Sequence, residues 1–343
     1  MLLLKGVTQN YAWGDRYALP ALLDITADGR PWAEIWYGTH PRGQAQVDDS
    51  VHLPAPTYLA DEVGDLPFIV KLLAAARPLS LQTHPSKQQA LDGFAREEKA
   101  LVPLDAPHRV YPDERAKPEM IVALSTFEAL CGFVNDAAAL RNCEAAGADE
   151  LARRVRSDGV ADSAKAILRG EKFAPPTSPS NAMRQLAEHH DDERALVALL
   201  MHHVRLAPGE ALYLDAGNVH TYLYGTALEV QGNSDNVVRA AFTEKHIDMD
   251  EFFKVARFAA IPDPRVLPER LSPITSAYRC GAPFEVMRHE LNGSFALTAK
   301  RQHTLLVCAS GRAGSLAAGA AAYVEKGESV ALEGTATIYS VSA

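Results

Sequence analysis

The best indication of the fold is the stretch Pro208-Gly-Glu-Ala-Leu-Tyr-Leu-Asp-Ala-Gly-Asn-Val-His220. It begins with turn chemistry at Pro208-Gly209, continues with an alternating strand-like segment, and returns to turn chemistry at Gly217-Asn218. A histidine, His220, then enters the next strand. Glycines at such corners allow the chain to bend sharply, because only glycine tolerates the backbone angles required. This part of the chain is therefore predicted to consist of short strands joined by tight turns.

A second stretch, Pro78-Leu-Ser-Leu-Gln-Thr-His-Pro85, places two metal-binding side chains two residues apart. On a strand, Gln82 and His84 would project from the same face. Two further donors follow along the chain, Glu119 in Lys117-Pro-Glu119 and His220. An amide oxygen, two imidazoles and one carboxylate suit a zinc-like ion with one coordination position left open. Because one donor of the four is anionic, a bound divalent ion would keep a positive charge and act as a Lewis acid.

The composition is that of a globular protein with a large core. The chain has 343 residues, 47% of them hydrophobic, and a formal net charge of −9. It has no basic stripe, which argues against a nucleic-acid partner. The start of the chain is too short for a signal peptide and no apolar run is long enough to cross a membrane, so we expect a cytoplasmic protein with no membrane association.

The hydrophobic periodicity divides the chain into three parts. Residues 1–134 and 204–258 carry short alternating segments and all four proposed metal donors. Residues 135–203 instead have apolar residues at steps of three and four, which predicts a helical insertion. Residues 259–343 return to short strands and turns. We therefore expect a mainly β protein whose first unit is discontinuous in sequence.

Taken together, these motifs make the chain similar to the class I mannose-6-phosphate isomerases (phosphomannose isomerases) of the cupin superfamily. Gly209, Gly217 and His220 resemble the second cupin motif, with Asp215 in place of its usual proline. The longest match ends at Arg239. The stretches that carry the resemblance are residues 10–15, 33–41, 66–85, 117–120, 217–220, 228–239 and 243–245.

The resemblance implies a bicupin, that is, two jelly-roll-like β-barrels, together with a helical domain. Residues 1–134 and 204–258 would form the catalytic cupin domain, and residues 135–203 the helical insertion. Residues 259–343 would form a C-terminal cupin-like domain, expected to be metal-free because it lacks a Gly-x-x-His sequence.

The activity implied is the interconversion of mannose 6-phosphate and fructose 6-phosphate through a cis-enediol, with one zinc ion per chain held by Gln82, His84, Glu119 and His220. The substrate is a small sugar phosphate, and we expect a monomer. Proton transfer between two carbons requires an acid–base group, and the enediolate requires a nearby positive charge.

The candidate catalytic residues are two lysines, an arginine and an aspartate. Lys71 and Lys117 are the candidates for proton transfer; burial and a nearby cation should lower the pKa of Lys71. Arg239 could bind the phosphate or stabilise the enediolate. Asp235 could hold Arg239 or act as an acid–base partner.

Three further residues are expected to bind or orient the substrate. Lys245 adds a second cation near Arg239, and Ser80 could donate to a phosphate oxygen. Glu229 could orient a group at the site. The aromatic motifs near Trp13 and Trp36 are interpreted as core packing.

The sequence departs from the family pattern at two places besides Asp215, and alternative functions remain open. Ala116 stands where many members have a histidine proposed to assist ring opening, and Arg239-Ala-Ala241 replaces the family's Arg-Gly-Gly. One alternative is an isomerase of unphosphorylated mannose and fructose, which would not need the phosphate-binding cations. Another is a non-catalytic sugar-binding bicupin. A metal-dependent oxygenase would use a histidine-rich ligand set, against which Gln82 argues.

Overall fold

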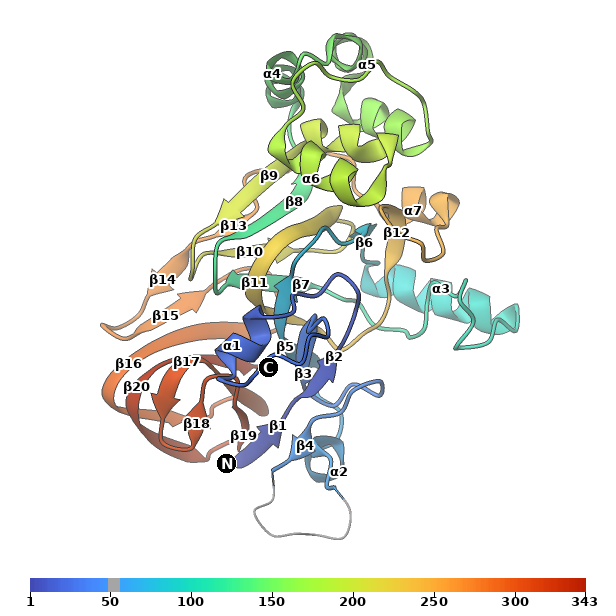
Figure 1. The fold of residues 1–343 in the computed structure, drawn as a ribbon. Helices are drawn as coiled ribbons and strands as arrows, with labels where there is room; N and C mark the ends of the chain where they lie inside the picture. The colour runs from blue at the N-terminus through green and yellow to red at the C-terminus, as the bar shows by residue number, and fades with distance from the viewer. Residues whose placement is uncertain (49–55) are drawn as a thin grey trace.

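The computed structural model describes residues 1–48 and 56–343 and confirms a mainly β protein. Its strands form two sheets, and the helices between residues 135 and 203 gather at one end of the molecule (Figure 1). The first sheet contains β2 (Val7–Gln9), β3 (Glu34–Tyr37), β5 (Phe68–Ala75), β6 (Leu81–Thr83), β7 (Glu119–Ala123), β8 (Phe127–Phe133), β9 (Met201–Leu206), β10 (Ala211–Leu214), β11 (His220–Gly232), β12 (Val238–Ala241) and β13 (Arg265–Val266). The second contains β1 (Leu2–Lys5), β4 (Gln46–Val47), β14 (Pro268–Arg270), β15 (Thr275–Tyr278), β16 (Glu285–Thr298), β17 (His303–Ala313), β18 (Leu316–Ala317), β19 (Ala321–Glu325) and β20 (Ser329–Ser342). The helical elements are α1 (Ala18–Leu22), α2 (Leu59–Val63), α3 (Lys87–Lys99), α4 (Asp136–Ala146), α5 (Asp149–Leu168), α6 (Asn181–His190), the 3₁₀ helix η1 (Glu193–Leu200) and α7 (Met249–Val255).

Strand β11 organises the first sheet because it pairs with four other strands. Its first half pairs with β6 and β8, and its second half with β5 and β7. Between the two halves lies Gly225, with φ +116°. A Cβ atom there would lie 2.4 Å from the carbonyl oxygen of Thr126, so glycine allows the two backbones to approach closely. The bend at Gly225 lets one strand hold His220 at one end and Glu229 near the other.

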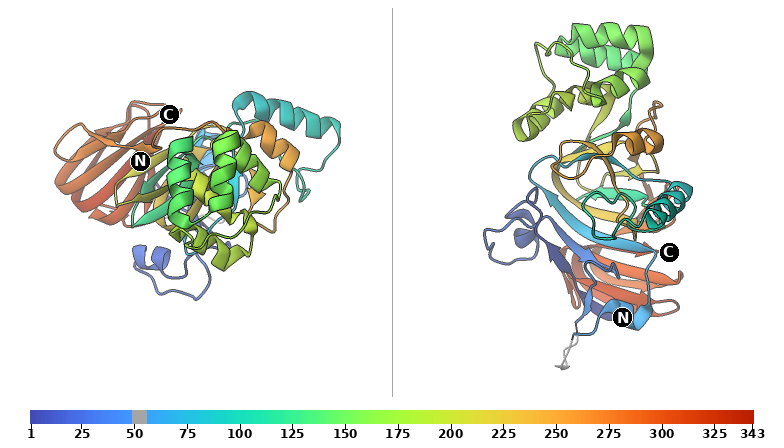
Figure 2. Two further views of the ribbon diagram at one scale, coloured as in Figure 1. Left: turned by 90° about the horizontal axis from the view of Figure 1, so that it is seen from above. Right: turned by 90° about the vertical axis from the view of Figure 1, so that its right-hand side faces the viewer.

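The predicted helices between β8 and β9 are present. α4, α5, α6 and η1 pack around a shared apolar core at the top of the molecule (Figures 1 and 2). The side chains of Asn135 and Ser180 cap α4 and α6 by accepting backbone N–H groups. The chain returns to the sheet at Met201, three residues before the predicted start of the strand at Val204. None of the helices in residues 1–48 and 56–343 has the length and apolar character needed to cross a bilayer.

The second sheet recruits strands from both ends of the chain. β16 and β20 pair along their whole lengths, and β1 pairs with β19 and β4. Conversely, β13, which comes from the C-terminal part of the chain, pairs with β10 in the first sheet. A single apolar cluster contains residues of both sheets, among them Leu4, Val70, Leu228 and Tyr339. The division of the chain into three domains stays a prediction, since the two sheets exchange strands and share a core.

Candidate active site

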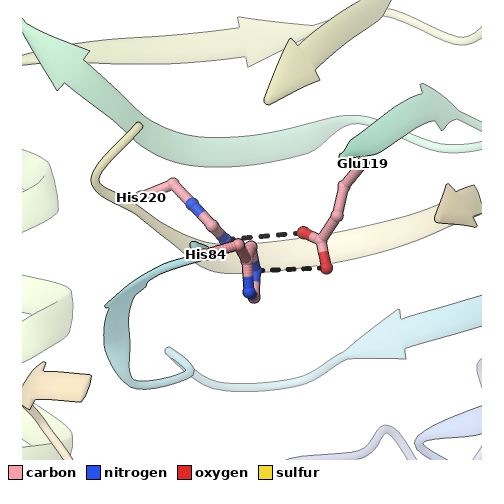
Figure 3. A group of neighbouring side chains, drawn as sticks. All are labelled: His84, Glu119 and His220. Carbon is pink, nitrogen blue, oxygen red and sulfur yellow. Dashed lines mark ion pairs between the residues drawn. The ribbon is translucent and has the colours of Figure 1, made fainter. Parts of the chain in front are cut away.

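Three of the proposed metal donors meet where strands of the first sheet begin or end (Figure 3). Glu119 opens β7, and His220 opens β11 directly opposite Gln82 on β6. His84 follows the end of β6, where its carbonyl oxygen accepts the backbone N–H of Gly217 (2.9 Å). The turn predicted at Gly217 therefore connects the two segments that carry the histidines.

The three donors are buried and close together. His84 Nε2 lies 3.2 Å from Glu119 Oε1, and His220 Nε2 lies 3.5 Å from Glu119 Oε2. One ligand atom from each residue can be chosen so that all lie within 4.8 Å of one another. Exposed fractions are 2% for His84 and 1% for both Glu119 and His220, so the cluster is shielded from bulk water.

Backbone carbonyls fix the tautomers of both imidazoles. The Nδ1 atom of His84 lies 2.8 Å from the carbonyl oxygen of Asn236, and that of His220 lies 3.0 Å from the carbonyl oxygen of Asn218. Because a carbonyl only accepts, each Nδ1 carries the proton and each Nε2 presents a lone pair to the cluster. Burial lowers the pKa of His84 to about 4, which favours the neutral ring. Burial alone would raise the pKa of Glu119, but the ammonium of Lys117 holds it well below its usual range.

This donor set fits a zinc ion. In the described part of the chain, the buried Nε2 atom of His84 has no hydrogen-bond partner. An unprotonated imidazole nitrogen and a carboxylate oxygen 3.2 Å apart repel each other unless a cation lies among them. The amide of Gln82 lies alongside, with its nitrogen 3.5 Å from His220 Nε2 and its oxygen accepting from Ser80 Oγ at 2.8 Å. Rotation of this amide would present the oxygen to the cluster, as a fourth ligand requires.

Lys71 lies between two buried carboxylates. Its Nζ atom is 3.1 Å from Glu229 Oε2 and 3.4 Å from Glu34 Oε1, and it lies 4.9 Å from the centre of the Trp36 ring. Burial alone would lower the pKa of Lys71, but Glu229 and Glu34 raise it above its ordinary value. The predicted lowering of this pKa was therefore wrong. Sequence reasoning missed Glu34 and the pairing of Lys71 with Glu229, and Lys71 is a positively charged donor in this arrangement.

A hydrogen-bonded chain joins the Lys71 group to the metal donors. The Tyr222 hydroxyl lies 3.0 Å from both Glu119 Oε2 and Glu229 Oε1. On the other side of Glu119, Lys117 Nζ lies 2.9 Å from Oε1. Burial and the two carboxylates raise the pKa of Tyr222 well above its usual range, so the hydroxyl keeps its proton. Both proposed catalytic lysines therefore lie within one network of charges that includes the metal donors.

Of the predicted residues near β12, Asp235 precedes the strand, Arg239 lies within it and Lys245 follows it. Asp235 is partly exposed and contacts His40 and Arg42, and its backbone N–H donates to Asp113 at 2.8 Å. Burial lowers the pKa of Arg239, an effect that Asp235 opposes. Burial and Arg239 also lower the pKa of Lys245, whose ammonium lies 5.6 Å from the centre of the Tyr11 ring. The two predicted phosphate-binding cations are thus electrostatically coupled.

Sequence reasoning did not identify four residues that complete this site: Glu34, Trp36, Asp113 and Tyr222. Trp36 is 5% exposed, as expected for core packing, but it also donates to Glu34 at 2.7 Å and faces the Lys71 ammonium. A signal was available in the Ala33-Glu-Ile-Trp segment, where a glutamate interrupts an otherwise apolar strand.

Comparisons with known proteins agree with this geometry. The phosphomannose isomerase type I catalytic domain matches residues 1–135. The mannose-6-phosphate isomerase of Escherichia coli (strain K12) is 33% identical, over 89% of this chain and 88% of that protein. This chain belongs to the mannose-6-phosphate isomerase family. The human member of the family is 29% identical, over 85% of this chain and 82% of that protein.

Solved structures of family members share the fold over nearly the whole chain. A crystal structure of a mutant of phosphomannose isomerase from Salmonella typhimurium superposes with a TM-score of 0.89, at 27% identity, and covers 100% of this chain and 99% of that one. A zinc-bound crystal structure of mannose 6-phosphate isomerase has a TM-score of 0.87, at 28% identity, over 99% of this chain and 98% of that one. The expectation of a class I mannose-6-phosphate isomerase is confirmed.

Proposed function

We infer that this chain is a zinc-dependent aldose–ketose isomerase that interconverts mannose 6-phosphate and fructose 6-phosphate. The observation that carries this conclusion is the buried cluster of His84, Glu119 and His220 in a chain 33% identical to a mannose-6-phosphate isomerase along most of its length. Zinc bound by these residues, with Gln82 proposed as the fourth ligand, supplies a Lewis acid that polarises a substrate oxygen.

The residues around the cluster have the chemistry needed to stabilise the enediolate that forms when a proton moves between C1 and C2 of the sugar. We propose Lys117 and Lys71 as the groups that donate to the substrate oxygens and stabilise a cis-enediol, since both ammonium groups are buried beside carboxylates. Glu229 contacts both Lys71 and Tyr222, so it keeps this lysine oriented. This is the orienting role that was expected for Glu229 from the sequence.

The phosphate-binding role proposed for Arg239 and Lys245 is supported by their electrostatics. In the described part of the chain, neither residue forms an ion pair with a carboxylate within 4.0 Å. Burial disfavours the charge on each, and Arg239 also disfavours the charge on Lys245. A dianionic phosphate relieves both effects, because it supplies the missing counter-charge and can accept two hydrogen bonds from the guanidinium. Ser80 is a further proposed donor, once a ligand releases its hydroxyl from Gln82.

The finer features of the architecture are also proposals. Two sheets with a helical region at one end are consistent with a bicupin, in which residues 1–134 and 204–258 form the catalytic unit and residues 259–343 a metal-free partner. In the latter region the buried His289 binds the hydroxyl groups of Thr275 and Ser340, a structural role. We further propose a cytoplasmic monomer.

One assay separates the proposed function from its alternatives. The zinc-loaded protein is incubated with mannose 6-phosphate and, in parallel, with mannose, and ketose formation is followed with and without a chelator. The proposal predicts turnover of the phosphorylated sugar only, lost on chelation and restored by zinc. Comparable turnover of mannose would identify a free-sugar isomerase, and binding without turnover would identify a sugar-binding protein.

A further inference from the structure

The segment that follows β3 carries a buried histidine that belongs neither to the metal cluster nor to the lysine network. β3 is paired with β5 so that Trp36 lies opposite Lys71, and the chain then turns at residues 38–43. His40 lies in this turn but is only 4% exposed. Its ring packs edge-on against Trp36, with a centroid separation of 5.1 Å and an interplanar angle of 85°.

The hydrogen bonds of His40 specify its tautomer. The backbone N–H of Arg42 donates to His40 Nδ1 at 3.2 Å, so Nδ1 is the acceptor nitrogen. In a neutral imidazole the proton then lies on Nε2. That nitrogen is 3.4 Å from Asp235 Oδ2, the oxygen that also lies 3.2 Å from Arg42 Nε. The side chains of His40 and Arg42 therefore converge on one oxygen of a single carboxylate.

Asp235 is held from a third direction by the backbone. Its N–H donates to Asp113 Oδ2 at 2.8 Å, and the neighbouring Ser234 hydroxyl donates to Asp113 Oδ1 at 2.8 Å. With the backbone anchored on one side and Oδ2 on the other, the Asp235 side chain has one defined orientation. It remains 25% exposed, so the carboxylate is accessible to a ligand although it is fixed.

We propose that His40 is a positioning residue that acts through Asp235. Its Nε2–H, locked by the Arg42 backbone and by Trp36, keeps the Asp235 carboxylate in one orientation. The inference rests on the proposed function, because it gives His40 a part in catalysis only if Asp235 acts on the sugar phosphate. It also assigns the segment from Glu34 to Arg42 a common role: Glu34 and Trp36 orient Lys71, while His40 and Arg42 orient Asp235.

The test compares two replacements of His40 with matched replacements of His289. His40→Leu removes the N–H donor, whereas His40→Gln retains an amide N–H at a similar reach. His289 is 3% exposed and hydrogen-bonded at both ring nitrogens, but it lies in the second sheet, away from Asp235. For all four variants we would measure kcat and KM for mannose 6-phosphate, zinc content and Tm.

We expect His40→Leu to lower kcat by about 10- to 100-fold with zinc content unchanged, since small misplacements of a reacting group carry losses of that size. His40→Gln should recover most of this loss. The His289 variants should lose Tm but keep kcat. If His40→Leu keeps wild-type kcat, or if His40→Gln is as impaired as His40→Leu, the positioning role is wrong and His40 is a packing residue.

A second measurement does not depend on turnover. Nitrogen-15 chemical shifts of the wild-type protein should show the Nε2–H tautomer for His40, and a proton on Nδ1 would overturn the inference. Lack of turnover by the zinc-loaded wild-type protein would instead overturn the proposed function, and with it the catalytic part of the inference. The two failures are therefore distinguishable.

Discussion

Replacement of Lys71 by methionine tests whether the buried carboxylates beside it depend on its charge. Methionine fills a similar volume, so the main change is the loss of the ammonium group. The two contacts, at 3.1 and 3.4 Å, join side chains that are 4–7% exposed. With an effective dielectric constant of 20, each contact corresponds to an attraction of about 5 kcal/mol, part of which is offset by desolvation. Since removal of one partner leaves a buried charge unpaired, we expect the free energy of unfolding to fall by roughly 3–5 kcal/mol at pH 7.5.

The pH dependence gives this prediction a second readout. Burial and Glu34 raise the pKa of Glu229, and Lys71 is the largest influence that lowers it. Without Lys71, the folded-state pKa of Glu229 lies further above its unfolded value. Such a group contributes stability below the unfolded pKa and loses it as the pH rises through the folded pKa. The deficit of the variant should therefore shrink between pH 7.5 and 5.5, by at most about 1.4 kcal/mol per pH unit for each proton bound.

Urea unfolding of metal-free wild-type protein and variant at the two pH values provides the measurement. Lys165→Met serves as the control, because Lys165 pairs with Asp162 at the surface, where the side chains are 34% and 63% exposed. Its loss should stay below about 1 kcal/mol. Addition of Glu229→Gln to Lys71→Met should restore part of the stability at pH 7.5. A loss under 1 kcal/mol for Lys71→Met, unchanged between the two pH values, would refute the argument that Lys71 neutralises these carboxylates.

Four further outcomes are expected. At a concentration 100 times its Kd, zinc should raise the free energy of unfolding of the wild-type protein by about 2.7 kcal/mol. In thermal unfolding, the same zinc concentration should stabilise His84→Leu much less. Gly225→Ala should destabilise the protein by about 2 kcal/mol or more in urea titrations, because its Cβ would lie 2.4 Å from a carbonyl oxygen. If the variant is as stable as the wild-type protein, the described backbone of β11 at Gly225 is wrong. Burial lowers the pKa of His289 to about 4. Wild-type protein should therefore lose up to about 2 kcal/mol more stability than His289→Gln between pH 6.5 and 5, since a histidine with a lowered folded-state pKa loses its contribution as the pH falls. Arg194, at the start of η1, donates to the carbonyl oxygen of Ala240 at 2.8 Å. Arg194→Ala should loosen the strand that carries Arg239 and so raise KM for mannose 6-phosphate several-fold. An unchanged KM would show that the position of this strand does not depend on Arg194.

The grouping of His84, Glu119 and His220 could be predicted in part from sequence because some of its signals are local. Gln82 and His84 are two residues apart, and His220 follows a glycine turn with a characteristic spacing. Their residue types already specify nitrogen and oxygen ligands. The presence of helices between residues 135 and 203 could be predicted for a similar reason, since a change from alternating to three- and four-residue periodicity is visible within each segment.

The environment of Lys71 could not be predicted in this way. Its partners, Glu34 and Glu229, lie 37 and 158 residues away in sequence and meet it only through the register of β3 and β11 with β5. A lysine in an apolar strand suggested that burial would lower its pKa, whereas the direction is set by two carboxylates from neighbouring strands. The role of His40 depends in the same way on Asp235, which reaches it across the fold.

Strand β1 has a consequence for synthesis of the protein. Leu2 lies opposite Tyr323 in the second sheet, so β1 cannot pair with β19 until the 320 residues between these two have been synthesised. Until β19 has been made, the backbone groups of β1 that pair with it have no partner, and unpaired strand edges promote association with other chains. Completion of this sheet must therefore wait for the synthesis of β19. A variant that lacks residues 321–343 would have neither β19 nor β20, and β1 would keep only its pairing with β4.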